Sequence, residues 1–99
     1  MQITKGLKMN DEVFEIRVGD FLANGAQVLA VYMDESEGAV LATWSSEFVT
    51  WVFSTSNQNS TAHGHYFMFD RNKEGDELGA YQRARKDFIQ RATKLSEEF

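Results

Sequence analysis

The sequence predicts an α+β fold: a bent antiparallel β-meander of about five strands with one C-terminal amphipathic helix. Between Gln27 and Phe53, three runs of β-branched, aromatic and aliphatic residues are separated by short polar segments, which is typical of consecutive antiparallel strands. From about Asp76 the apolar residues recur about every 3.6 positions, the period of an α-helix. A length of 99 residues fits one domain, so we expect 1–99 to fold as a single unit.

The N-terminal part is predicted to form a first hairpin and two turns. Leu7–Met9 and Val13–Val18 flank the polar stretch 10–12, and apolar residues alternate in the second of these two arms. Gly19–Asp20 then turns the chain. Asn24–Gly25 is the strongest turn signal in the sequence, because both residue types tolerate a positive φ.

Further strands are expected along the middle of the chain. Three central strands are predicted at 27–33, 39–45 and 48–53, and a last strand at 63–69. Residues 54–62 are polar or small and show no periodicity, so they are predicted to form an exposed loop. Because the strands and turns are short, an SH3-like partial barrel is one form that this sheet can take.

The predicted helix starts near Asp76, which is a good N-cap residue. Asp76 and Glu77 suit the positive end of the helix dipole, and Lys94 suits its negative end. Helical spacing places one stripe of residues against the sheet, with Ile89 beside it: Leu78, Tyr81, Arg85, Phe88, Ala92, Leu95 and Phe99.

The predicted sheet carries apolar side chains on both faces, whereas one helix covers only one of them. In the strand 39–45, for example, Val40, Ala42 and Trp44 point away from Leu41. The second face can be covered by curling of the sheet into a closed core, by a second copy of the chain, or by another protein. If its aromatic residues are exposed, they are expected to anchor an interface: Tyr32, Trp44, Trp51, Phe53 and Tyr66.

The composition argues against several classes of function. The chain has no Cys, which excludes disulfides, thiolate chemistry and zinc sites built on Cys. It has no run of about twenty apolar residues that could span a membrane, and the N-terminal residues lack the apolar core of a signal peptide, so we expect a cytoplasmic protein. The net charge of −5 disfavours binding to nucleic acid, because the phosphates would be repelled.

Few residues suit catalysis or metal binding. His63 and His65 are two positions apart, so in a strand both would point to one side and, with Asp70 or Glu47, could hold a metal ion. The spacing fixes no third ligand, and the alternative is a half-buried strand residue at 65 and a loop residue at 63. A histidine buried at an interface would make association depend on pH near about 6. The sequence contains no phosphate-binding glycine loop and no GxSxG motif, so no enzymatic activity and no cofactor are predicted.

Four motifs carry a resemblance: Val18–Val31 (VGDFLANGAQVLAV), Val40–Trp44 (VLATW), Phe48–Trp51 (FVTW) and Gly64–Phe67 (GHYF). Together they are similar to short uncharacterised prokaryotic and phage proteins, in which a strand that ends in an aromatic cluster precedes a helix with Ala, Phe and Arg. The helix residues here are Ala84, Phe88 and Arg91. The resemblance covers about 13–91, except for the departures at 54–62 and 70–75. It implies a small, non-enzymatic accessory protein, which a phage can encode, and it transfers no active site.

These observations predict a small protein-binding module that acts by occupying a partner surface, either as a homodimer or with another protein. A phage-encoded inhibitor of a host system, of the anti-restriction or anti-CRISPR type, is one concrete form. The acidic charge, the two apolar sheet faces and the lack of catalytic motifs favour this class. The alternative is a β-domain that binds a small ligand or a metal ion in a pocket near His63 and His65.

Overall fold

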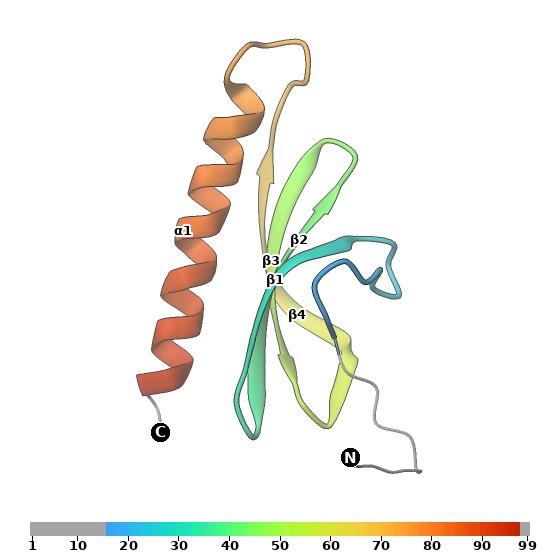
Figure 1. The fold of residues 1–99 in the computed structure, drawn as a ribbon, viewed down its shortest axis with the longest axis vertical. Coiled ribbons are helices and arrows are strands. Elements are labelled where there is room, and N and C mark those ends of the chain that lie inside the picture. The colour runs from blue at the N-terminus through green and yellow to red at the C-terminus, as the bar shows by residue number, and fades with distance from the viewer. Residues whose placement is uncertain (1–15, 98–99) are drawn as a thin grey trace.

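The computed structural model describes residues 16–97, without the side chains of 57–60, and shows an antiparallel sheet with one helix packed on it (Figure 1). The strands follow one another in the sheet in their order along the chain, each pairing with the next. This is the meander that the three β-forming runs predict. The elements are β1 (Gln27–Met33), β2 (Glu37–Trp44), β3 (Glu47–Ser54), β4 (Asn57–Met68) and α1 (Asp76–Glu97).

The predicted loop at 54–62 is wrong. Only Thr55 and Ser56 form the turn after β3, and the chain enters β4 at Asn57. Val52 pairs with Ala62 and Phe53 with Thr61, so main-chain pairing continues through this polar segment. β4 is an edge strand, where polar side chains can remain hydrated. Because its first half is polar, hydrophobic alternation does not predict a strand there.

The described residues form four strands and an open sheet, not five strands or an SH3-like barrel. β1 and β4 lie at opposite edges and do not pair. Of the predicted N-terminal hairpin, Leu7–Met9 and the first part of Val13–Val18 lie outside the described residues. Ile16 to Val18 form no strand, and the chain turns at Val18 and Gly19. The Asn24–Gly25 turn is confirmed: Gly25 has φ of 93°, and Asn24 Oδ1 accepts a 3.0 Å hydrogen bond from Ala26 N.

One face of the sheet packs against α1 through a set of apolar residues that we call the helix-facing cluster. The predicted helix is confirmed, and so is part of its stripe: Leu95 is buried, and Tyr81 and Phe88 pack against the sheet. The rest of the stripe differs. Leu78 is 59% exposed and Arg85 is exposed, whereas small residues one turn apart face the sheet and let the helix approach closely. The buried members of the helix-facing cluster are Leu41, Phe48, Phe69, Ala80 and Ala84.

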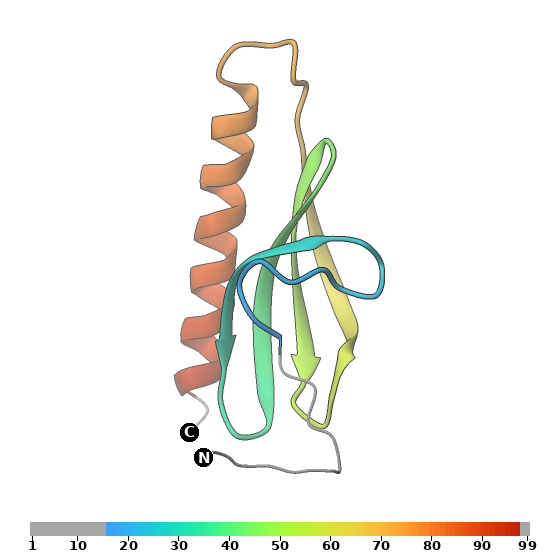
Figure 2. The same cartoon turned by 45° about the vertical axis from the view of Figure 1, so that its right-hand side comes forward.

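The other face of the sheet is covered by the chain itself. Residues 16–26 lie across it, on the side opposite α1 (Figures 1 and 2). Ile16 and Ala26, 1% and 0% exposed, are buried against strand residues of this face, and Trp44 Nε1 donates a 3.2 Å hydrogen bond to Asn24 O. The second buried group, the far-face cluster, comprises Ile16, Leu22, Ala26, Val28, Val40, Ala42, Val49, Trp51 and Phe53.

Two glycines in the sheet are covered by aromatic rings. Gly38 pairs with Phe53, and a Cβ on Gly38 would lie 2.3 Å from Phe53 Cζ. A Cβ on Gly64 would lie 2.6 Å from Tyr66 Oη and 2.8 Å from Trp51 Nε1. All three distances are too short for a carbon atom, so the rings occupy space that only glycine leaves free.

No helix within residues 16–97 combines the length and the apolar character that crossing a membrane would require.

Candidate functional site

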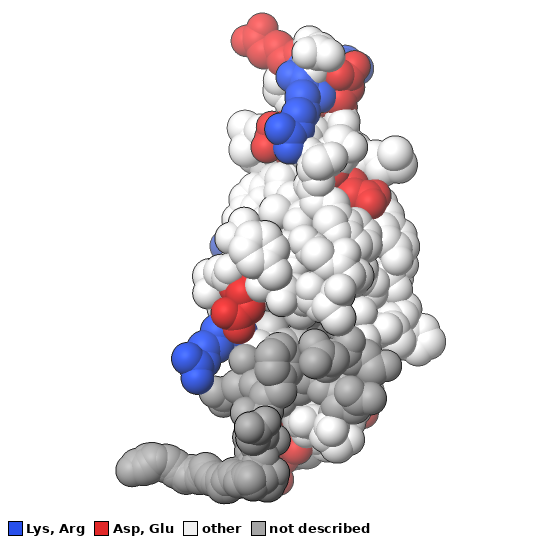
Figure 3. Space-filling view, turned by 90° about the vertical axis from the view of Figure 1, so that its right-hand side faces the viewer, with Lys and Arg blue, Asp and Glu red and all other residues white. Residues whose placement is uncertain are grey.

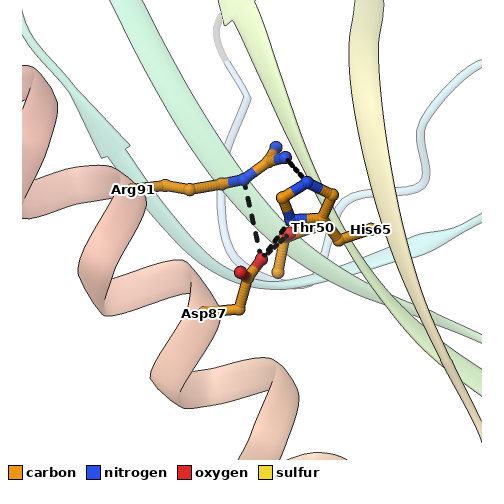
Figure 4. A network of polar contacts seen from close by, with 4 residues as sticks. All are labelled: Thr50, His65, Asp87 and Arg91. Atoms are coloured by element: carbon orange, nitrogen blue, oxygen red, sulfur yellow. Dashed lines mark hydrogen bonds and ion pairs between the residues drawn. The ribbon is translucent and has the colours of Figure 1, made fainter.

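Four polar side chains meet where α1 lies over β3 and β4 (Figure 4). Thr50 and His65 are directly opposite each other in the β3–β4 ladder, so both side chains project from the same face of the sheet. Asp87 and Arg91 are four residues apart on α1 and therefore lie on one side of the helix. The helix places both of them above the strand pair, and we call these four residues the polar network.

Asp87 is the centre of the polar network. Its Oδ2 accepts a 2.5 Å hydrogen bond from Thr50 Oγ1, and it lies 2.9 Å from His65 Nδ1. Arg91 Nε lies 3.6 Å from the same oxygen, and Arg91 Nη2 lies 2.5 Å from His65 Nε2. One carboxylate oxygen thus joins the helix to both strands.

These contacts define which ring nitrogen of His65 carries the proton. A guanidinium group only donates hydrogen bonds, so His65 Nε2 accepts from Arg91. Nδ1 then carries the proton that is donated to Asp87. Both nitrogens of the neutral ring are engaged, although the His65 side chain is 52% exposed.

The polar network also shifts two pKa values. Burial alone would raise the pKa of Asp87, but the hydrogen bonds from Thr50 and His65 and the positive charge of Arg91 act against it, and this pKa lies below its ordinary value of 3.8. Burial lowers the pKa of Arg91, and Asp87 opposes that shift. Arg91 remains charged, and its Nη1 is buried without a hydrogen-bond partner in the described part of the chain.

The geometry of the polar network fits a structural contact that holds the helix on the sheet better than it fits a reactive centre. An aspartate bound to Nδ1 of a histidine is the arrangement of a general base, but that role needs Nε2 free to accept a proton. Here Nε2 faces Arg91. Metal binding through His65 would require the same lone pair, and residues 16–97 contain no group of three or more His, Cys, Asp or Glu that could hold a metal ion.

His63 lies apart from the polar network. The β3–β4 register shifts between Thr50 and Val52, so the regular alternation that would place His63 and His65 on one side is interrupted between them. His63 has φ of 55°, a left-handed conformation that suits an extra residue in a bulge. It lines a shallow, open depression together with Glu37, Val52, Phe53, Ser54 and Ala62.

Three of the predicted interface residues form an aromatic row on the face opposite α1. The Trp44 and Trp51 rings are 5.2 Å apart at an interplanar angle of 84°, and the Trp51 and Tyr66 rings are 6.3 Å apart at 86°. Trp51 is buried at 5% exposure, Trp44 is partly exposed, and Tyr66 is 54% exposed. The row runs from the far-face cluster to the surface at β4.

The two other predicted interface residues lie elsewhere. Phe53 is 4% exposed and packs over Gly38 within the far-face cluster. Tyr32 is half-buried and lies opposite Ala39 on the face that carries α1. The prediction did not include Met68, which is 71% exposed and two residues beyond Tyr66 on β4.

Sequence reasoning also missed the polar network. Asp87 and Arg91 have the i, i+4 spacing of a helical ion pair, and this spacing was not used in the prediction. That signal was available. The contact with Thr50 could not be predicted from the sequence, because it depends on how the helix is rotated on the sheet.

Comparison with known proteins gives no match to a protein-family profile, to a curated protein or to a solved structure. The resemblance to short prokaryotic and phage proteins therefore stays a prediction.

Proposed function

We propose that this chain is a small, non-enzymatic protein-binding module whose contact surface is the exposed end of the aromatic row. The observation that carries the proposal is the exposure of two large apolar side chains, Tyr66 at 54% and Met68 at 71%. They are two residues apart in β4, so they project from the same face of the sheet. We call this pair the β4 surface.

The chemistry of the β4 surface suits recognition of a protein. Tyr and Met are enriched at protein interfaces, where an aromatic ring supplies a large contact area and a thioether adapts to the partner's shape. The Tyr66 ring packs edge-on against the buried Trp51, so part of the entropy cost of ordering it is already met in the free chain. On the side of the molecule away from α1, a largely uncharged area separates two groups of charged residues (Figure 3).

The narrower form of this function is a phage-encoded inhibitor of a host restriction or CRISPR system. The net charge of −5 supports it, because proteins that handle nucleic acid present basic surfaces that an acidic protein can occupy.

Affinity capture with the tagged chain tests the proposal. We expect a protein from the natural host, or added chain of the same sequence, to be retained by the wild type and lost when Tyr66 and Met68 are both replaced by Ser. The matched control replaces Leu78 and Ile89 by Ser, because these residues are similarly exposed, at 59% and 44%, but lie on α1. Equal retention by both double variants would exclude the β4 surface as the contact.

A further inference from the structure

The outer edge of β4 is an unpaired sheet edge. β4 pairs with β3 on one side, and within residues 16–97 no strand pairs with its other side. Such an edge presents main-chain N–H and C=O groups that can pair with another strand. The opposite edge differs, because Gly19 N and Asp20 O make hydrogen bonds of 2.8 Å each to the main chain of Val28 at the start of β1.

β4 also lacks the residues that usually protect an edge. Edge strands are commonly blocked by Lys, by other charged side chains or by Pro. Residues 57–68 contain no Lys, Arg, Asp, Glu or Pro, in a chain of which 25% is charged. Irregularities in the β3–β4 ladder lie before His65, and from His65 to Met68 the register is regular. This last stretch is therefore the part of the edge best shaped to accept a strand.

The charge pattern favours a second copy of the same chain as that strand. Two copies carry −5 each and repel one another across most of their surfaces. In a two-fold interface each edge meets its own copy, so a charged residue on the edge would face a like charge. β4 carries no Asp, Glu, Lys or Arg, so contact along it avoids this repulsion. A strand from a basic partner would find no acidic side chain on this edge to pair with.

We propose that two copies of the chain join antiparallel along β4, about a two-fold axis at Tyr66, so that the two sheets become one continuous sheet. This inference rests on the proposed function and names its partner. In this register Tyr66 lies opposite Tyr66 of the partner subunit, and Met68 lies opposite Gly64 of the partner subunit. Gly64 projects no side chain, and the Tyr66 ring that covers it supplies an apolar surface for Met68.

A single introduced thiol tests the register, because the chain has no Cys of its own. Directly opposed residues of antiparallel strands have Cβ atoms about 4.5–5.5 Å apart, close to the span of a disulfide. We expect the Tyr66→Cys variant at about 10 µM, treated with the thiol oxidant diamide, to form a disulfide-linked dimer of twice 11.3 kDa, and the Ile89→Cys control on α1 to stay at 11.3 kDa under the same treatment. Equal cross-linking of the two variants would overturn the proposed register.

Light scattering on the unmodified chain tests the association itself. We expect a mass approaching twice 11.3 kDa at about 100 µM. Met68→Lys should raise the dissociation constant at least about tenfold, because it would bury a charged ammonium group against the apolar surface of the partner subunit, whereas Leu78→Lys should leave it unchanged. Unchanged circular dichroism shows that both variants fold.

A mass of 11.3 kDa at every concentration up to about 500 µM would overturn the inference. The proposed function would still stand if the monomer captured another protein through Tyr66 and Met68. The proposed function would be excluded only if the double Ser variant of Tyr66 and Met68 captured the same proteins as the wild type.

Discussion

Thr50, the buried polar residue of β3, donates a 2.5 Å hydrogen bond from Oγ1 to Asp87 Oδ2 on α1. The Thr50 side chain is fully buried, so without this acceptor its hydroxyl would lose hydration and gain nothing in return. The bond therefore fixes both the rotation and the position of the helix on the sheet. It also links the packing of the helix-facing cluster to the charge state of one carboxylate.

Replacing Asp87 by Asn should destabilise the fold by about 1–3 kcal/mol. The substitution removes the negative charge that serves Thr50, His65 and Arg91, and it leaves the guanidinium group of Arg91, which is only 14% exposed, without a counter-charge. Urea denaturation measures the change. Glu74→Gln, in the exposed turn before α1, is the control and should change stability by less than about 0.5 kcal/mol. Equal effects of the two substitutions would show that the polar network adds nothing specific.

Asp87 should also make stability depend on pH in acid. Its pKa in the folded chain lies below the ordinary value of 3.8, so between these two values the unfolded chain binds more protons than the folded one. The stabilisation is therefore complete above about 3.8 and is lost as the pH falls through the folded-state pKa. Urea midpoints recorded from pH 7 to pH 2 should fall more steeply in this acid range for the wild type than for Asp87→Asn. Parallel curves would contradict the assignment.

Gly64→Ala should destabilise the chain by about 1–3 kcal/mol and alter its tryptophan fluorescence. The new methyl group would lie 2.8 Å from Trp51 Nε1, and Trp51 is buried and cannot move away freely. Gly79→Ala is a control of opposite sign, because its Cβ would meet only Arg83 Nη1 at 3.4 Å and alanine favours a helix by about 1 kcal/mol. Thermal melts of both variants give the comparison, and a neutral Gly64→Ala would show that the ring does not rest on this glycine.

Ile16→Ala should cost about 2–4 kcal/mol, because Ile16 is 1% exposed and holds residues 16–26 against the far-face cluster. Val18→Ala, at a residue that is 65% exposed, should cost less than about 0.5 kcal/mol. Chemical denaturation followed by tryptophan fluorescence suits this pair, since Trp51 belongs to the same cluster. A small effect at Ile16 would mean that the segment does not protect this face.

The sequence located most elements, since hydrophobic periodicity decided them. β1 was predicted with its observed bounds, 27–33, and the helix with its observed start at Asp76. The start of β4 was missed because pairing with β3, rather than its own side chains, makes residues 57–62 a strand. The stripe of α1 was predicted in part, since Leu95 is buried and Tyr81 and Phe88 pack against the sheet. Ala80 and Ala84 were missed because they carry little hydrophobic signal, although their small size decides which side of the helix approaches the sheet.

The excess of apolar surface on the sheet was also predicted, but its cover was not. Residues 16–18 were predicted to end a hairpin arm, and turns were predicted at Gly19–Asp20 and Asn24–Gly25. Nothing in this pattern shows that Ile16 and Leu22 fold back over the far face. That contact joins segments distant along the chain, so it follows from the topology and not from local preference. Of the five aromatic residues proposed for an interface, the structure leaves Tyr66 the most accessible, at 54%.

The rings that cover Gly38 and Gly64 limit which substitutions these two positions can accept. At 64 the close atoms belong to the side chains of Tyr66 and Trp51, so a larger residue there is tolerable only after these rings have become smaller. At 38 an added Cβ would also lie 2.7 Å from the main-chain oxygen of Tyr32, so a smaller residue at 53 does not make room and only glycine fits. We therefore expect Gly64 and its two rings to change together in evolution, and Gly38 to remain glycine. Distant homologues of this chain should therefore be easier to detect by scoring these contacting positions jointly than by counting identical residues one position at a time.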